Sequence, residues 1–161
     1  RQYLKNWRKI MKRNMVQYEN EEFITSTMPV DGILVVDVNL QGILELAPHT
    51  ERFKQAFPAT YKKYMEKVIR KELAVGEVLW CTEDDYTIAL IVTAERIIGR
   101  YKDDAELVQI YTEEAISNLL EQVAEETLLF GMVNRFLGYT GDAIVYINKK
   151  LTTQNVYMYR R

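Results

Sequence analysis

The segment DVNLQGILELAPHTERFKQAFPATYKKYM (residues 37–65) decides the fold of this chain. It continues a run rich in β-branched residues, GILVVDV (32–38), which predicts a strand buried on both faces of a sheet. Its second half predicts two helices, the first capped by Thr50 and ended at Pro58, because aromatic residues recur there at helical spacing. A loop between such a strand and helix commonly cradles a phosphate with glycines. Gly42 is the only glycine in this loop, so the residues around it bear directly on function.

The rest of the chain alternates between predicted strands and helices. Further strands are predicted at 77–82, 86–93, 128–133 and 155–159. Helices are predicted at 2–18, 51–57, 59–72 and 104–124, with a short one through Ile144, Ile147 and Leu151. Buried strands that alternate with helices favour an α/β domain with helices on both sheet faces. We therefore expect a single α/β domain over residues 19–161, preceded by a basic amphipathic helix over 1–18.

Three loops follow predicted strands, at 39–50, 93–101 and 134–143. In open α/β sheets, ligands bind beyond the carboxyl ends of the strands. These loops are therefore expected to gather at one edge of the sheet, and a ligand site is expected there.

Composition and charge narrow the functional classes. A net charge of −2 with 27% charged residues is ordinary for a globular domain. Cys81 is the only cysteine, which excludes an internal disulfide framework and favours a reducing, cytoplasmic location. No apolar run approaches the ~20 residues of a membrane span, so no membrane association is predicted. Basic residues crowd 1–13 and acidic residues crowd 103–126, a separation that can steer a partner or favour self-association.

The order of the segments resembles that of the macrodomain family, whose members are ADP-ribose-binding modules. The most specific part is FKQAFPATYKKYMEKVIRKELAVGEVLW (53–80), which is closest to the branch with an FKxAFPxxYxxY…GEV segment. TIALIVTAERIIGRY (87–101) stands where the family has a strand and a polar loop, and LVQIYTEEAISNLLEQV (107–123) where it has a long helix. LLFGMVNRFLGYTGD (128–142) stands where a strand enters the second glycine loop. The resemblance covers residues 20–159 and implies a mixed sheet with helices on both faces.

The departures from the family pattern fall on the residues that the resemblance implies for chemistry. The family's first loop reads N-x-x-N-x-x-G-x-M-G-x-G. Asn39 and Gly42 match its second Asn and first Gly, whereas Glu45 and Ala47 replace later glycines. Glycine lets backbone amides approach a diphosphate, and a glutamate there opposes it by like-charge repulsion. Hydrolytic members use a lysine in the middle loop, where this chain has Arg96, a cation that does not lose its proton near neutral pH.

The candidate ligand-binding residues are Asn39, Gly42, Gly138, Tyr139 and Gly141. Asn39 could orient a ribose and a water, or it could satisfy backbone groups at a strand end. The two later glycines could present amides to a phosphate or form an ordinary turn, and Tyr139 could stack on a base or pack at the rim. Asn39 and Arg96 are the only candidates that the resemblance offers for catalysis. No cofactor and no metal site is predicted, because contiguous carboxylates such as those at 83–85 are usually solvated in a turn.

The loop that lacks the later glycines is expected to close over the sheet edge. Ile43, Leu44 and Leu46 are predicted to fold down on the strand ends, because they would otherwise form an exposed apolar patch. The result would be a narrowed or closed pocket lined by 43–46 and 137–141.

Four functions follow from these observations. The first is a degenerate, non-hydrolytic macrodomain-like protein with weak or lost binding of ADP-ribose or a related nucleotide. The second is a protein-interaction or self-associating subunit, in which the basic helix 1–18 docks on the acidic 103–126 surface. The third is nucleic-acid binding through the same helix with Arg96, Arg100 and Arg135. The fourth is an ADP-ribosyl hydrolase.

Overall fold

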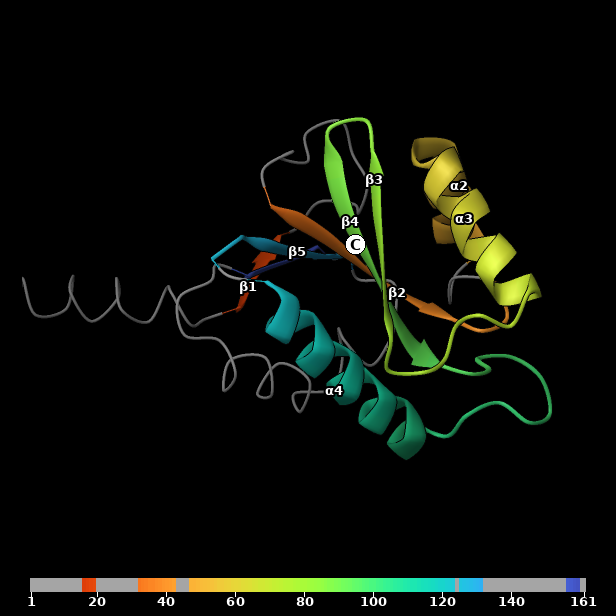
Figure 1. Ribbon diagram of the computed structural model, residues 1–161. Helices are drawn as coiled ribbons and strands as arrows, with labels where there is room; N and C mark the ends of the chain where they lie inside the picture. Colours follow the sequence, from red (N-terminus) through yellow and green to blue (C-terminus); the bar gives the residue numbers. More distant parts are fainter. Residues whose placement is uncertain (1–15, 20–31, 43–46, 124, 132–155, 160–161) are drawn as a thin grey trace, which may run out of the picture.

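The computed structural model describes residues 16–19, 32–42, 47–123, 125–131 and 156–159 (Figure 1). Its strands are β1 (Val16–Glu19), β2 (Ile33–Asn39), β3 (Val78–Glu83), β4 (Tyr86–Ala94), β5 (Leu128–Gly131) and β6 (Val156–Tyr159). Its helices are α2 (Ala47–Ala56), α3 (Pro58–Ile69) and α4 (Ala105–Gln122). Strands and helices over residues 32–131 occur where the sequence predicts them, apart from small shifts at their ends.

The strands form one six-stranded sheet in the order β1-β6-β5-β2-β4-β3. The neighbouring strands are parallel, except that β3 pairs with β4 in antiparallel register. The predicted mixed sheet is therefore confirmed. Because β2, β4 and β5 are parallel, their carboxyl ends lie at the same edge of the sheet.

Alternate residues of the central strands belong to two separate cores. Helix α4 lies on one side of the sheet, and α2 and α3 lie on the other (Figure 1). On one face, Ile33, Val35 and strand β4 pack against the apolar side of α4. On the other face, the next residues of the same strands pack against α2 and α3. All seven residues of β2 are buried, as a strand covered on both faces requires.

The helix pair α2–α3 is broken at the predicted place. Phe57 separates the two helices, and Pro58 begins α3 at the position where its missing N–H costs nothing. The prediction for Thr50 was wrong: α2 begins at Ala47, so Thr50 lies within the helix and does not cap it. The rings of Phe53, Phe57 and the following tyrosines form one cluster, in which Phe53 and Phe57 meet at a tilt and Tyr61 makes edge-to-face contacts.

The N-terminus of α3 is capped by a side chain from a different part of the chain. The Glu83 carboxylate accepts hydrogen bonds from the backbone N–H groups of Thr60 (2.7 Å) and Ala59 (3.1 Å). A carboxylate at this end also complements the helix dipole. The interpretation of Glu83 as a solvated turn residue was therefore wrong, because it satisfies two amides that α3 leaves open.

The N-terminal helix prediction needs one correction. Residues 16–18 were expected to end a helix, but they belong to strand β1, which pairs with β6. β-branched Val16 and aromatic Tyr18 suit a strand as well as a helix, and pairing with β6 decides between the two. Residues 1–15 lie outside the described part of the chain, so a helix there stays a prediction.

Candidate functional site

Asn39 ends the central strand β2 and is almost fully buried, with 3% of its surface exposed. Its Oδ1 accepts a hydrogen bond from the Gln41 N–H at 2.8 Å. Its carbonyl oxygen accepts a hydrogen bond from the hydroxyl of Tyr64, a fully buried residue of α3. Asn39 therefore shapes the backbone just beyond the strand, which is one of the two roles expected from the sequence.

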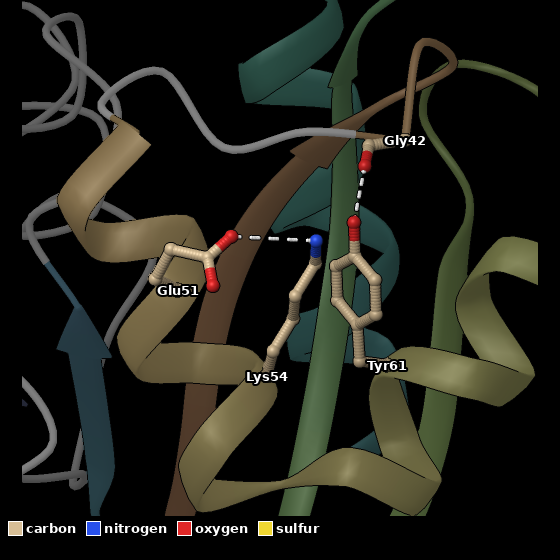
Figure 2. Close-up of polar contacts among 4 residues, drawn as sticks. All are labelled: Gly42, Glu51, Lys54 and Tyr61. Carbon is tan, nitrogen blue, oxygen red and sulfur yellow. Dashed lines mark hydrogen bonds and ion pairs between the residues drawn. The ribbon is translucent and has the colours of Figure 1, made fainter.

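Gly42 lies three residues further on, in a conformation that favours glycine. Its φ angle is +79°, and a Cβ at this position would lie 2.6 Å from the sulfur of Met65. The hydroxyl of Tyr61 donates a hydrogen bond to the Gly42 carbonyl oxygen at 2.7 Å (Figure 2). Lys54 stands beside the same ring, with its Nζ 5.0 Å from the ring centroid and 3.5 Å from Glu51 Oε1. The glycine thus marks a point where α3 closely supports the loop.

Gln41 joins this loop to the loop that follows β4. Its Oε1 accepts hydrogen bonds from the backbone N–H groups of Ile97 (2.8 Å) and Ile98 (3.1 Å). Its Nε2 donates to the Ile98 carbonyl oxygen at 3.1 Å. The loops at 39–42 and 95–98 therefore meet at the carboxyl edge of the sheet, as predicted. The hydrogen bonds of Gln41 could not be predicted from local sequence, because their partners lie 56 and 57 residues further along the chain.

A pocket of about 590 Å³ opens at the same edge, between the carboxyl ends of β2 and β4 and the end of α3. The described residues that line it are Leu40, Gln41, Val68, Lys71, Leu73, Glu95 and Arg96. Arg96, a candidate for catalysis from the sequence, contributes to this pocket, whereas Asn39 is absent from the lining. The structure therefore does not gather the two catalytic candidates around one described cavity.

The remaining site predictions lie outside the described residues. They concern Gly138, Tyr139 and Gly141, the loop at 134–143, and the closed pocket expected between 43–46 and 137–141. Sequence reasoning missed the two tyrosines as supports of the loop, although their spacing four and seven residues after Phe57 placed them on one helix face.

Cys81 is buried in β3, and burial raises the pKa of its thiol above the ordinary value. The expectation that it packs as a small apolar group is in accord with that environment. Across the described residues, no three side chains of His, Cys, Asp or Glu gather as a metal site would require. Among the described helices, none has the length and apolar character needed to span a bilayer.

Comparison with known proteins gives a consistent answer for the fold. The sequence matches no protein-family model and no curated protein. The macrodomain of Thermus aquaticus DarG superposes with a TM-score of 0.65 at 18% identity, over 90% of this chain and 96% of that one. The macrodomain of Mycobacterium tuberculosis DarG gives 0.67 at 16% identity, over 91% and 98%. Thermosipho africanus DarTG, solved in complex with ADP-ribose, gives 0.57 at 17% identity, over 80% of this chain and 38% of that one.

These likenesses define the fold. The chain is an α/β domain whose mixed six-stranded sheet carries a candidate site at the carboxyl ends of its parallel strands. It has the macrodomain fold, in a form that has diverged far from the solved examples. The resemblance inferred from the sequence is thereby confirmed at the level of the fold.

Proposed function

We propose that this chain is a macrodomain-type module that binds ADP-ribose or a related nucleotide weakly and does not hydrolyse it. The observation that carries this proposal is the support of residues 39–42. Tyr64 holds the Asn39 carbonyl, Tyr61 holds the Gly42 carbonyl, and Gln41 ties the loop to Ile97. A rim fixed in this way can meet a ligand without first paying the entropy of ordering.

Weak rather than tight binding is expected from the residues that follow the loop at 39–42 in the sequence. Glycines that would open the backbone to a diphosphate are replaced by Glu45 and Ala47. The helix α2 begins at Ala47, and its second residue, Pro48, has no N–H to donate. Because the family pattern has glycines facing the diphosphate at these positions, a glutamate at position 45 and the missing amide donor at position 48 are expected to reduce the affinity for a dianionic ligand.

The absence of hydrolysis rests on Asn39 and Arg96. Asn39 is only 3% exposed, and its Oδ1 accepts a hydrogen bond from the Gln41 N–H, so this side chain serves to hold the loop. Arg96 is exposed, and an arginine is a poor general base. The ADP-ribose in the DarTG structure belongs to that protein, and it supports this proposal through the shared fold.

Isothermal titration with ADP-ribose tests the binding half. We expect a dissociation constant on the order of 10–500 μM, which corresponds to about 4.5–7 kcal/mol of binding free energy. Asn39→Ala should weaken binding several-fold, whereas Lys62→Ala, which removes an exposed lysine of α3, should not. Release of ADP-ribose from a modified protein or DNA tests the other half, and the expected rate is that of buffer.

A second function is favoured by exposed apolar side chains near the start of α4. Leu107 and Ile110 are 37% and 52% exposed and lie three residues apart on one helix face, and Tyr101 in the preceding loop is 71% exposed. Single exposed apolar residues are ordinary, but three so close in the chain suit a protein contact.

We infer that residues 1–15 of another copy, which are basic, supply that contact beside the acidic side chains of α4. Light scattering of the intact chain should then give a larger mass than a chain that starts at Val16. Equal masses at low and high salt would exclude this self-association.

A further inference from the structure

The pocket beside Lys71 and Arg96 is built from an apolar floor and a charged rim. Leu40, Val68 and Leu73 form the floor, and all three are partly buried. The rim carries the exposed side chains of Lys71, Glu95 and Arg96. A volume of about 590 Å³ falls within the range of small-molecule sites in proteins.

The two cations of the rim have no carboxylate partner among the described residues. Glu72, next to Lys71 in the chain, pairs instead with Lys67 at 3.1 Å. Asp103 contacts Arg96 through the backbone, but its carboxylate accepts a hydrogen bond from the Glu95 N–H at 2.7 Å. Lys71 and Arg96 therefore stand at two sides of the pocket without an ion pair to a described residue, and with the Glu95 carboxylate the rim keeps a net charge of +1 (two cations and one anion).

Lys71 occupies a backbone conformation that a lysine rarely adopts. Its φ angle is +56°, at the position that ends α3, where glycine is the common residue. The Lys71 and Glu72 N–H groups donate back to the carbonyl oxygens of Val68 (3.1 Å) and Lys67 (2.9 Å), which closes the helix. A glycine would adopt this φ angle with less strain, so a lysine at position 71 has a conformational cost.

The loop that carries Arg96 is fixed by hydrogen bonds on both sides. The Asp103 N–H donates to the Arg96 carbonyl oxygen at 2.9 Å, and Gln41 holds the backbone of Ile97 and Ile98. The Arg96 main chain is thus anchored, and its side chain extends from a defined point. The pocket is preorganised by the same glutamine that joins the two loops.

We propose that this pocket is a second ligand site, which takes a small phosphate ester carried on an apolar ring. Two separate cations suit the two negative charges of a phosphomonoester, and an arginine can bind its oxygens in bidentate fashion. The aliphatic floor suits the face of a ring, and the Glu95 carboxylate disfavours a ligand with a further negative charge. The pocket shares Leu40 and Gln41 with the loop proposed to meet ADP-ribose, but Asn39 is not among its described lining residues, so phenyl phosphate tests it separately from ADP-ribose.

Phenyl phosphate is the probe that tests this site on the intact chain. Titration followed by methyl NMR should shift the resonances of Leu40, Val68 and Leu73 with one saturable curve. Phenol, which has the ring without the charge, should bind at least about fivefold more weakly. Inorganic phosphate, which has the charge without the ring, should also bind more weakly and leave the three methyl groups nearly unshifted.

Two variants separate the site from the fold. Arg96→Ala and Lys71→Gly should each weaken phenyl phosphate by about fivefold, while Lys62→Ala should leave it unchanged. Because glycine suits the conformation at position 71, Lys71→Gly should keep or raise the melting temperature. No binding of phenyl phosphate at millimolar concentration, or equal binding by both variants and the parent chain, would overturn the proposal.

Discussion

The Tyr61 hydroxyl donates a hydrogen bond to the Gly42 carbonyl oxygen across 2.7 Å, so helix α3 supports the loop that follows the central strand. The two residues are 19 positions apart, and Gly42 is the last described residue before the segment in which the family pattern expects further glycines. Tyr61 therefore contacts the loop directly before the residues that depart from the family pattern.

Tyr61→Phe should lower the free energy of unfolding by about 0.5–1.5 kcal/mol, the usual net value of a hydrogen bond of this kind. The ring, its edge contacts and its position over Lys54 are retained, so the change isolates the hydroxyl. Urea denaturation measures the difference. Tyr101→Phe is the matched control, because Tyr101 is 71% exposed, and it should change stability by less than ~0.5 kcal/mol. Equal effects of the two substitutions would mean that the bond to Gly42 does not hold the loop.

Tyr64→Phe should be more costly, because it leaves the buried Asn39 carbonyl without this donor. The expected loss is about 1–3 kcal/mol. Burial raises the pKa of the Tyr64 hydroxyl above its ordinary value of 10.0. The unfolded chain therefore loses this proton at lower pH than the folded chain does, so the contribution of Tyr64 to stability is full below pH 10 and falls as pH rises further.

Unfolding free energies between pH 8 and pH 11 check this sign. The parent chain should lose stability more steeply above pH 10 than Tyr64→Phe, which lacks the group. Parallel curves for the two chains would show that the hydroxyl of Tyr64 does not titrate differently in the folded state.

Gly42→Ala should destabilise the protein by about 1–2 kcal/mol, because an L-residue is strained at φ +79°. The added Cβ would also press on the sulfur of Met65, which lies 2.6 Å from its ideal position. Gly99→Ala is the comparison, since it has φ +101° but nothing within 4 Å of its added Cβ. Combining Gly42→Ala with Met65→Ala in a thermal unfolding series should recover the part of the loss that comes from contact. If the stability losses of the two single variants simply add in the double variant, the whole destabilisation by Gly42→Ala comes from the strained backbone and none from the contact with Met65.

Glu83→Gln should cost about 0.5–2 kcal/mol, because the amide keeps only one of the two oxygens that accept from Ala59 and Thr60 and also loses the charge that complements the dipole. Asp85→Asn removes a charge from the same turn, where the side chain is exposed, and should be nearly neutral. Chemical denaturation of both variants at low salt gives the comparison. If Asp85→Asn were as costly as Glu83→Gln, the effect would be one of net charge rather than capping.

The parts of the fold that follow local rules could be predicted from the sequence. The buried strand at Ile33–Asn39 is encoded by its β-branched run, and the break before α3 by Pro58. The Asp104 side chain caps α4 by accepting from the Leu107 N–H at 2.8 Å, at the start of the helix expected there. Each of these features is decided within a few residues of the chain.

The features that shape the candidate site depend on contacts between distant segments. From the sequence alone, Gln41 is an ordinary loop residue, and only the fold brings Ile97 and Ile98 beside it. Glu83 is likewise an ordinary turn carboxylate, and only the fold places it at the N-terminus of α3, whose Thr60 is 23 residues away in sequence. Lys71 gives no sign of its positive φ angle, because lysine is not a residue that marks such positions. Residues 16–18 were predicted to end a helix from their apolar spacing, and their pairing with β6, at the opposite end of the chain, could not be predicted from local sequence.

The most direct test of the proposed function is isothermal titration of the intact chain with ADP-ribose, at ligand concentrations that reach about 1 mM. We expect saturable binding with one site per chain, a dissociation constant on the order of 10–500 μM, and loss of most of that affinity in Asn39→Ala. No measurable heat up to the highest concentration, or binding that Asn39→Ala leaves unchanged, would contradict it.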